Sequence, residues 1–374
     1  YQDMRDEARK ILDAVGLECG GANIQFAVNP QTGKRVVIEM NPRVSRSSAL
    51  ASKATGFPIA KIAALLAIGY RLDEIKNDIT GTTPSCYEPA LDYVVTKIPR
   101  FAFEKFPGAK DQLSTQMKSV GEVMGIGRSF KESLQKALCS LETSCGFDEV
   151  KFDKQQLAFP SSQRIFQLGQ AFREGLEFSE IQALTGISHW FLHQIQSILQ
   201  CEEEIKRSET NPENLLAWKR MGFSDKRLAK LLNKKPQDLR EERLAAGVRP
   251  TYLQVDTCAG EFFSETPYFY STYWSEEEVK RDGAQPVVII GSGPNRIGQG
   301  IEFDYCCVRG VKKFRALGDP VVMINSNPET VSTDYDTSDQ LYFEPLDHEH
   351  VMSVIDWVKP KGVVIQLGGQ TPLS

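Results

Sequence analysis

The spacing of apolar and polar residues divides the chain into three zones. Residues 1 to about 143 mix helices with two strand-like runs, Asn23 to Val28 and Arg35 to Met40, which a turn-rich segment joins. From about residue 144 to 285, apolar residues recur at helical spacing between polar or glycine breaks, so this zone is predicted to be all-α until a strand-like run at Thr251 to Val255. From Pro286 strand-like and helical runs alternate, which indicates a parallel sheet with crossover helices.

Caps and breaks within these patterns predict the individual elements. Helices are expected at Asp3 to Val15, Ser47 to Thr55, Ile59 to Gly69, Ser129 to Leu141, Arg164 to Gly175, Ser179 to Gly186, Trp190 to Lys206, Asn211 to Gly222, Ser224 to Asn233, Pro236 to Ala246, Gln299 to Leu317 and His348 to Val358. Further strands are expected at Leu91 to Ile98, Pro286 to Ile290, Val321 to Asn325, Leu341 to Glu344 and Gly362 to Gln366.

Composition narrows the class of protein. Of the 374 residues, 41% are hydrophobic and 25% are charged, as expected for a folded chain of two or three domains rather than a disordered one. The net charge of −5 argues against a dedicated nucleic-acid binder. The longest strongly apolar stretch, Ile59 to Ile68, is too short to cross a bilayer, and the chain has no signal-peptide pattern. We therefore expect a cytoplasmic protein with neither membrane nor nucleic-acid partners.

The sharpest candidate chemistry lies on the two strand-like runs of the first zone. Side chains alternate faces along a strand, so Glu39 and Asn41 share a face, and Gln25 joins them if it pairs opposite Glu39. Oxygen donors without sulfur or imidazole suit Mg²⁺ or Mn²⁺, and a single carboxylate leaves positions for phosphate oxygens. Arg43 and Arg46 follow directly, and guanidinium groups match phosphate geometry. The alternative is a solvent-exposed hairpin whose polar residues have no ligand.

Several motifs carry a resemblance to a known family. Ile38 to Val44, with the sequence Ile-Glu-Met-Asn-Pro-Arg-Val, resembles the metal-site signature of ATP-grasp enzymes, which include carbamoyl-phosphate synthetases and biotin-dependent carboxylases. Carboxylases continue with Gln-Val-Glu-His, which this chain lacks. The continuation and four further segments resemble the large chains of bacterial carbamoyl-phosphate synthetases; they are Ser45 to Gly56, Asp92 to Phe101, Met117 to Met124, Gly293 to Tyr305 and Asn327 to Asp334.

The resemblance implies a mixed, multi-domain fold. Residues 1–143 would be the C-terminal part of a first ATP-grasp α+β domain, 144–285 an all-α oligomerisation domain, and 286–374 a Rossmann-like α/β pre-ATP-grasp domain that opens a second half. The chain starts without methionine and stops soon after Gly368-Gly369, so we expect a central piece of a longer protein. Such a piece would carry no complete active site and would bind Mg–ATP no more tightly than about 1 mM, or about −4 kcal/mol.

The resemblance also assigns roles to individual residues. Gln25, Glu39 and Asn41 would bind the two divalent ions that bridge ATP phosphates, with Glu39 bridging both ions. Arg43 and Arg46 would line that site or the passage leading from it. Arg46, Glu302 and Glu329 would line an internal tunnel for carbamate. Helix-start and loop capping is the alternative for the two glutamates.

The reaction implied is ATP-dependent carbon–nitrogen ligation. One ATP would phosphorylate bicarbonate, ammonia would attack the carboxyphosphate, and a second ATP would phosphorylate the resulting carbamate, for arginine and pyrimidine biosynthesis. The implied partners are a glutaminase small chain and further copies through the helical domain, and the implied ions are Mg²⁺ or Mn²⁺, possibly with K⁺. Another ATP-grasp ligase or carboxylase, or an isolated helical interaction module, are the alternatives.

Three other patterns suggest sites that we consider weaker. Gly291-Ser292-Gly293-Pro294 follows a strand, but Arg296 stands where a dinucleotide fingerprint needs its third glycine. His189 and His193 have the spacing of a helical zinc pair, without the glutamate of a zincin. A basic stretch from Lys219 to Lys235 fits a helix-turn-helix that faces DNA, although a solvated helical face or a subunit contact is favoured.

Overall fold

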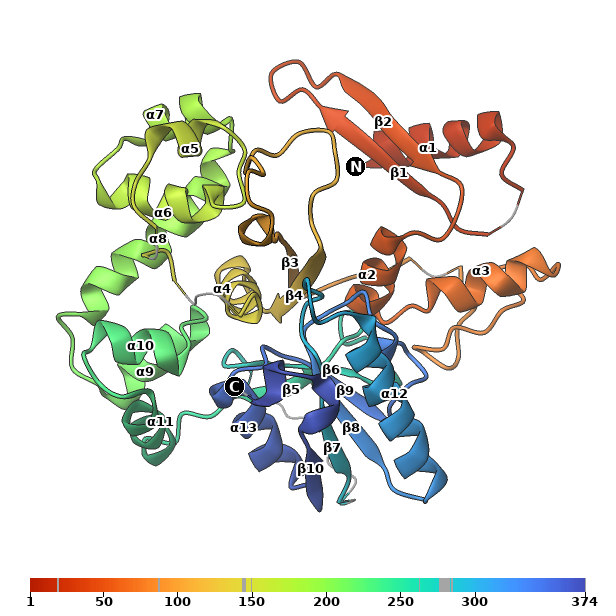
Figure 1. Ribbon diagram of the computed structural model, residues 1–374. Coiled ribbons are helices and arrows are strands. Elements are labelled where there is room, and N and C mark those ends of the chain that lie inside the picture. Colours follow the sequence, from red (N-terminus) through yellow and green to blue (C-terminus); the bar gives the residue numbers. More distant parts are fainter. Residues whose placement is uncertain are drawn as a thin grey trace. The chain divides into compact units, whose positions relative to one another are not determined.

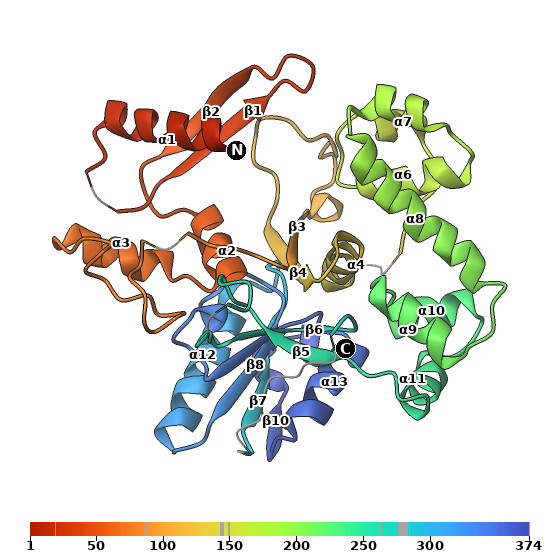
Figure 2. The same cartoon turned by 180° about the vertical axis from the view of Figure 1, so that it is seen from behind.

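A computed structural model describes residues 1–18, 20–86, 88–142, 146–148, 150–261, 263–275, 283 and 285–373. The chain forms two compact units, one of Tyr1–Leu91 with Val255–Pro267 and one of Asp92–Gln254 with Tyr268–Ser374 (Figures 1 and 2). The predicted boundary between residues 143 and 144 lies outside the described residues. The domain ranges 1–143, 144–285 and 286–374 therefore stay predictions.

The first unit holds a two-stranded sheet and three helices. Its elements are α1 (Gln2–Val15), β1 (Asn23–Val28), β2 (Arg35–Asn41), α2 (Arg46–Thr55) and α3 (Ile59–Ala67). Arg35 joins the sheet to α1, because its guanidinium pairs with Glu7 at 2.8 Å and with Asp3 at 3.2 Å. Helix α1 precedes β1 in the sequence and β2 follows it. The contact of Arg35 with α1 therefore holds the hairpin against the helix.

Short helices make up the middle of the second unit. They are α4 (Phe130–Ser140), α5 (Lys154–Ala158), α6 (Arg164–Arg173), α7 (Phe178–Thr185), α8 (His189–Ile205), α9 (Pro212–Arg220), α10 (Asp225–Leu231) and α11 (Pro236–Ala245). The side chains of Ser188, Asn211 and Ser224 each accept a backbone N–H at a helix start, as capping residues do. Leu192 and Ile198 of α8 are fully buried in the apolar core that these helices share.

A six-stranded sheet with two covering helices forms another part of the second unit. Its elements are β5 (Thr251–Gln254), β6 (Tyr268–Thr272), β7 (Val287–Ile290), α12 (Ile301–Ala316), β8 (Val321–Asn325), β9 (Gln340–Phe343), α13 (His348–Val358) and β10 (Gly362–Val364). The strand order is β10-β7-β8-β9-β6-β5, parallel except for β5. Val288 and Ile290 pack with α13, whereas Ile289 lies beside Gly310 of α12. Because alternate residues face opposite sides of a strand, the two helices cover opposite faces (Figure 1).

A hairpin leads into the helical part of this unit. It consists of β3 (Val94–Arg100) and β4 (Gly121–Gly127), which pair antiparallel. A Cβ on Gly125 would lie 2.4 Å from the carbonyl oxygen of Ser133, so glycine allows β4 to approach α4 closely. The backbone N–H of Met124 donates to the carbonyl of Ser326 at 2.9 Å. The hairpin is therefore joined to the segment that follows β8 of the sheet.

The mixed fold, the run of short helices and the parallel sheet with crossover helices are confirmed. The helices end before Thr251, as the pattern suggests, but the pattern misses the strand Tyr268–Thr272, which carries β5 into the large sheet. That strand is buried along its whole length, so it lacks the polar alternation of a half-buried strand. The patterns also miss β4, whose three glycines obscure its strand character.

Among the described residues no single helix is long and apolar enough to be a candidate membrane span. The pair α2 and α3 passes that test only when the two are taken together, and their axes are bent by 115°.

Candidate metal and phosphate site

The hairpin of the first unit has the register that the metal-site hypothesis requires. Gln25 pairs with Glu39, and Asn23 pairs with Asn41, in an antiparallel arrangement. A bulge between Gln25 and Phe26 shifts the register for the rest of the hairpin. The bulge lies after Gln25, so it does not change the register of the two pairs just named. Gln25, Glu39 and Asn41 therefore project from one face. The geometric prediction is confirmed.

The three side chains also touch one another. Glu39 Oε1 accepts a hydrogen bond from Gln25 Nε2 at 3.0 Å and another from Asn41 Nδ2 at 3.1 Å. Gln25 and Glu39 are exposed, and Asn41 is half-buried. The carboxylate therefore meets two neutral amides and water, with no cation among the bonds described for it. A negative charge is held in place here without being neutralised.

This donor set fits a hard divalent cation. Rotation of each amide about its terminal torsion would turn its oxygen toward the carboxylate, and carboxylate and amide oxygens are ligands that Mg²⁺ accepts. Among the described residues no group of three His, Cys, Asp or Glu side chains is placed to hold a metal ion. A site with one carboxylate needs further oxygen ligands, and the phosphates of a nucleotide would supply them.

Two arginines follow the hairpin along the chain. Arg43 lies just past the end of β2, is exposed, and donates from Nη1 to the carbonyl of Val44 at 3.2 Å. Arg46 is the first residue of α2 and is also exposed. Ser45 and Ser48 form a capping box that begins this helix. The cap fixes the backbone from which Arg46 projects, five residues after Asn41 in the sequence.

The two predicted tunnel glutamates both follow strands of the large sheet. Glu302 lies in the first turn of α12, is exposed, and accepts the backbone N–H of Gly300 at 3.3 Å. Glu329 lies in the segment after β8, and its own N–H donates to Asn327 Oδ1 at 2.9 Å. The capping alternative for Glu302 thus has a hydrogen bond in its support. Arg46 belongs to the other unit, so a tunnel wall shared by all three residues stays a prediction.

The glycine turn after β7 is filled by the protein itself. Arg296 Nη1 pairs with Glu142 Oε2 at 2.9 Å, and Arg296 Nη2 donates to Thr371 Oγ1 at 3.2 Å. A Cβ on Gly293, whose φ is 67°, would lie within 2.3 Å of Glu142 Oε1. The carboxylate of Glu142 therefore stands against the turn, where a dinucleotide fold would place pyrophosphate.

The basic stretch is only in part the solvated face that the sequence favours, because Lys226, Lys230 and Lys235 are exposed while two other cations are buried. Lys219 and Arg227 are only 3% and 4% exposed. Lys219 donates to Glu349 and, at 2.7 Å, to the carbonyl of Phe223, while Arg227 Nη2 pairs with Glu202 at 2.6 Å. Two cations of the proposed DNA-facing set are thus buried in ion pairs. Sequence spacing cannot show the contact with Glu349, because this partner of Lys219 lies 130 residues away.

The pair of Lys219 and Glu349 belongs to a larger buried group of charged side chains, which we call the ionic cluster. It consists of Lys219, Asp225, Arg243 and Glu349. Arg243 is fully buried; its Nη2 lies 2.8 Å from Asp225 Oδ2, and its Nη1 donates to the carbonyl of Val248 at 2.9 Å. The four residues come from α9, α10, α11 and α13. The cluster therefore joins the helical part of the second unit to its sheet.

Comparison with known families decides the identity. Residues 1–75 match the model of the carbamoyl-phosphate synthase L chain ATP-binding domain, and residues 122–247 that of the carbamoyl-phosphate synthetase large-chain oligomerisation domain. Residues 283–374 match that of the carbamoyl phosphate synthase preATP-grasp domain. The chain belongs to the carbamoyl-phosphate synthetase large-chain family.

Individual relatives agree with this family along the whole chain. The carbamoyl phosphate synthase large chains of Halomonas eurihalina and Archaeoglobus fulgidus are 56% and 53% identical, and each alignment covers all of this chain and 36% of the relative. That of Thermotoga neapolitana is 56% identical, over all of this chain and 34% of the relative. The chain spans about a third of the length of these curated relatives. The ATP-binding model covers the hairpin with Gln25, Glu39 and Asn41, as well as Arg43 and Arg46.

Proposed function

We propose that the hairpin of Gln25, Glu39 and Asn41 binds divalent metal and ATP phosphates in an ATP-dependent ligase. The observation that carries this is the contact of both amides with one exposed, unneutralised carboxylate, within the segment that matches an ATP-binding domain. The metal, Mg²⁺ or Mn²⁺, would neutralise phosphate charge. Arg43 and Arg46 would hold phosphate or carboxylate oxygens by guanidinium hydrogen bonds.

The longer protein would make carbamoyl phosphate. Its substrates would be bicarbonate, ammonia and two ATP, with two metal ions per ATP site and K⁺ as a further ion. Ammonia would come from a glutaminase small chain, and the product would serve arginine and pyrimidine biosynthesis in the cytoplasm. Arg46, Glu302 and Glu329 would line the carbamate tunnel. Phosphoryl transfer of this type depends on positioning and charge neutralisation more than on a protein nucleophile.

The metal assignment is tested with Glu39→Gln in the full-length protein. The substitution keeps the shape of the side chain and removes its charge, so bicarbonate-dependent ATP cleavage at this site should be abolished. Glu18→Gln, in the loop after α1, is the matched control and should leave cleavage unchanged. Normal activity in Glu39→Gln would remove this residue from the mechanism. ATP cleavage that does not depend on bicarbonate would favour another ATP-grasp ligase.

We also propose that the helical part mediates association with a second copy. The match of residues 122–247 to an oligomerisation domain supports this, as do Trp190 and Phe191, which are 53% and 45% exposed at the start of α8. Apolar side chains gathered on a surface favour contact with a partner. We expect a dimer or a higher species at micromolar concentration, measured by light scattering. A monomer across that range would refute the proposal.

A further inference from the structure

A pocket opens in the segment between β3 and β4 of the second unit. It has a volume of about 320 Å³, and its wall includes the rings of Phe103 and Phe106 and the side chains of Lys110 and Lys118. Two alanines and a valine complete the lining. This size lies at the lower end of the range found for small-molecule sites, and an apolar lining with a few polar groups is typical of them.

Hydrogen bonds tie the segment around the pocket to the helical part. The backbone N–H of Leu113 donates to the carbonyl of Pro160 at 2.8 Å. The backbone N–H and hydroxyl of Ser162 both donate to the carboxylate of Asp111, at 2.8 and 2.5 Å. Lys118 Nζ donates to the carbonyl of Gln112 at 2.5 Å, which fixes its direction across the segment. The segment that follows Lys110 is therefore held to the helical part by these contacts.

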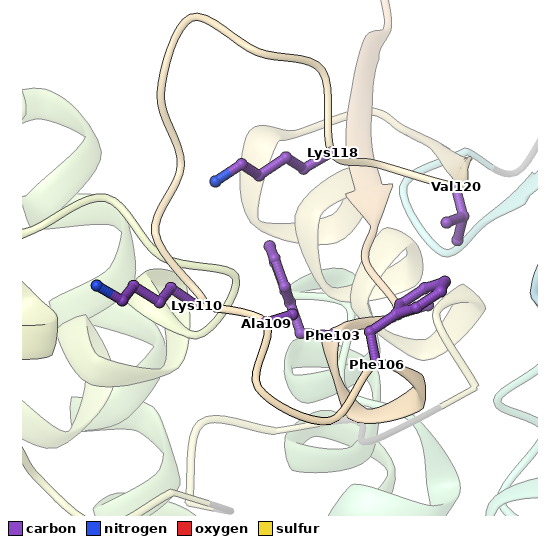
Figure 3. Close-up of a pocket in the computed structure, with 7 residues that line it drawn as sticks. Phe103, Phe106, Ala109, Lys110, Lys118 and Val120 are labelled. Atoms are coloured by element: carbon purple, nitrogen blue, oxygen red, sulfur yellow. The ribbon is translucent and has the colours of Figure 1, made fainter.

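The pocket is positively charged on one side and apolar on the other. Figure 3 shows the side chains of Lys110 and Lys118 extending to one side of Phe103, with Phe106 and Val120 on the other. Asp111 is the acidic residue next to Lys110, and Ser162 already occupies its carboxylate. The residues that line the pocket thus include two lysines and no carboxylate.

We propose that this pocket binds a small organic anion with a flat apolar body. Its carboxylate or phosphate would lie between the ammonium groups of Lys110 and Lys118, where opposite charge gives attraction. Its body would pack on the rings of Phe103 and Phe106, whose faces favour stacking. Phe106 is 53% exposed, so burial of its ring by a ligand would also contribute. The residues that line this pocket belong to the second unit, whereas those of the proposed metal and ATP site belong to the first.

Four probe compounds distinguish the contribution of the ligand's anionic group to binding from that of its flat apolar part. They are 1-naphthyl phosphate, 1-naphthoate, the neutral 1-naphthol, and inorganic phosphate, titrated calorimetrically into this chain without divalent metal. Both naphthyl anions should bind saturably at one site, and naphthol and inorganic phosphate at least about tenfold more weakly. The tighter of the two naphthyl anions shows whether phosphate or carboxylate is preferred. Because metal is absent, the result is independent of the ATP proposal.

Variants then locate the site. Lys110→Met combined with Lys118→Met should weaken binding of both naphthyl anions at least about tenfold, and added salt should reduce binding to the unsubstituted chain. Phe106→Ala should weaken the naphthyl compounds and leave inorganic phosphate unaffected. Lys105→Met, which removes one positive charge in the same segment outside the pocket, is the control and should bind as the unsubstituted chain does. Absence of saturable binding, or equal loss in the control, would overturn the proposal.

Discussion

Two carboxylates of this protein are held in opposite ways. Glu39 on the hairpin is exposed and accepts hydrogen bonds from the neutral amides of Gln25 and Asn41. Glu349 in the ionic cluster is 7% exposed and accepts from Lys219 and from the backbone N–H of Asp225. The first carboxylate keeps its charge available to a ligand. The second has had its charge compensated within the fold.

The cost of burial explains the difference. Moving a charge out of water is costly, so a buried carboxylate persists in its charged form only where cations and hydrogen-bond donors surround it. Burial opposes ionisation of Glu349, but Lys219, His350 and Arg243 outweigh it and lower the pKa of this carboxyl. Glu39 is exposed and keeps its hydration, so it does not meet this cost and its partners need not be charged. A charged group is thus evidence of a ligand site chiefly where the protein leaves it uncompensated.

The largest expected effect comes from breaking the ionic cluster. Glu349→Ala removes one of the two acidic partners of the buried Lys219 and leaves only Asp225, and removing one member of a buried ion pair typically costs about 3–5 kcal/mol. We expect a loss of this size in the free energy of unfolding of the second unit, measured with urea.

Asp356→Ala is the matched control, since Asp356 lies on the same helix and pairs with Arg240 at 2.7 Å while 47% exposed. A surface pair of this kind contributes about 0–1 kcal/mol. Equal losses in the two variants would show that the ionic cluster is no more important than a surface contact.

A smaller effect is expected from pH. Burial lowers the pKa of His350, but the charge of Asp347 and a hydrogen bond at 2.7 Å raise it to about 9, from an ordinary value of 6.5. The charged imidazole therefore stabilises the fold fully below pH 6.5, and this contribution is lost as the pH rises through about 9. Its size is at most about 3 kcal/mol.

Urea unfolding measured between pH 6 and pH 9.5 checks this. Stability should fall over that interval, and His350→Asn should flatten the decline because the titrating group is gone. His348→Asn removes an exposed histidine from the same helix start and should keep the slope of the unsubstituted chain. A decline that His350→Asn leaves intact would contradict the assignment.

The two regions also differ in how far the sequence predicts them. The hairpin face follows from alternation along two neighbouring strands, so Gln25, Glu39 and Asn41 are found from local spacing once the register is assumed. The ionic cluster draws Lys219 and Glu349 together across 130 residues, and no local pattern marks that pairing. Strand β6 is missed because it is buried along its whole length and so lacks polar alternation. Local chemistry is thus predictable, whereas compensation of charge depends on the tertiary fold.

The smallest expected effect is that of Glu39→Gln on the free energy of unfolding. Glu39 is exposed and its partners are neutral amides, so a glutamine that keeps the carbonyl oxygen can still accept their hydrogen bonds. Surface substitutions without a buried partner usually change stability by less than about 0.5 kcal/mol. We therefore expect the free energy of urea unfolding of the first unit to change by less than about 0.5 kcal/mol. Mn²⁺ binding, followed by electron paramagnetic resonance, should be weakened. Loss of stability comparable with that of Glu349→Ala would mean that the hairpin carboxylate supports the fold. Unchanged stability together with unchanged Mn²⁺ binding would leave Glu39 without either role. Only the combination of intact fold and weakened metal binding fits a carboxylate that the protein keeps uncompensated for a ligand.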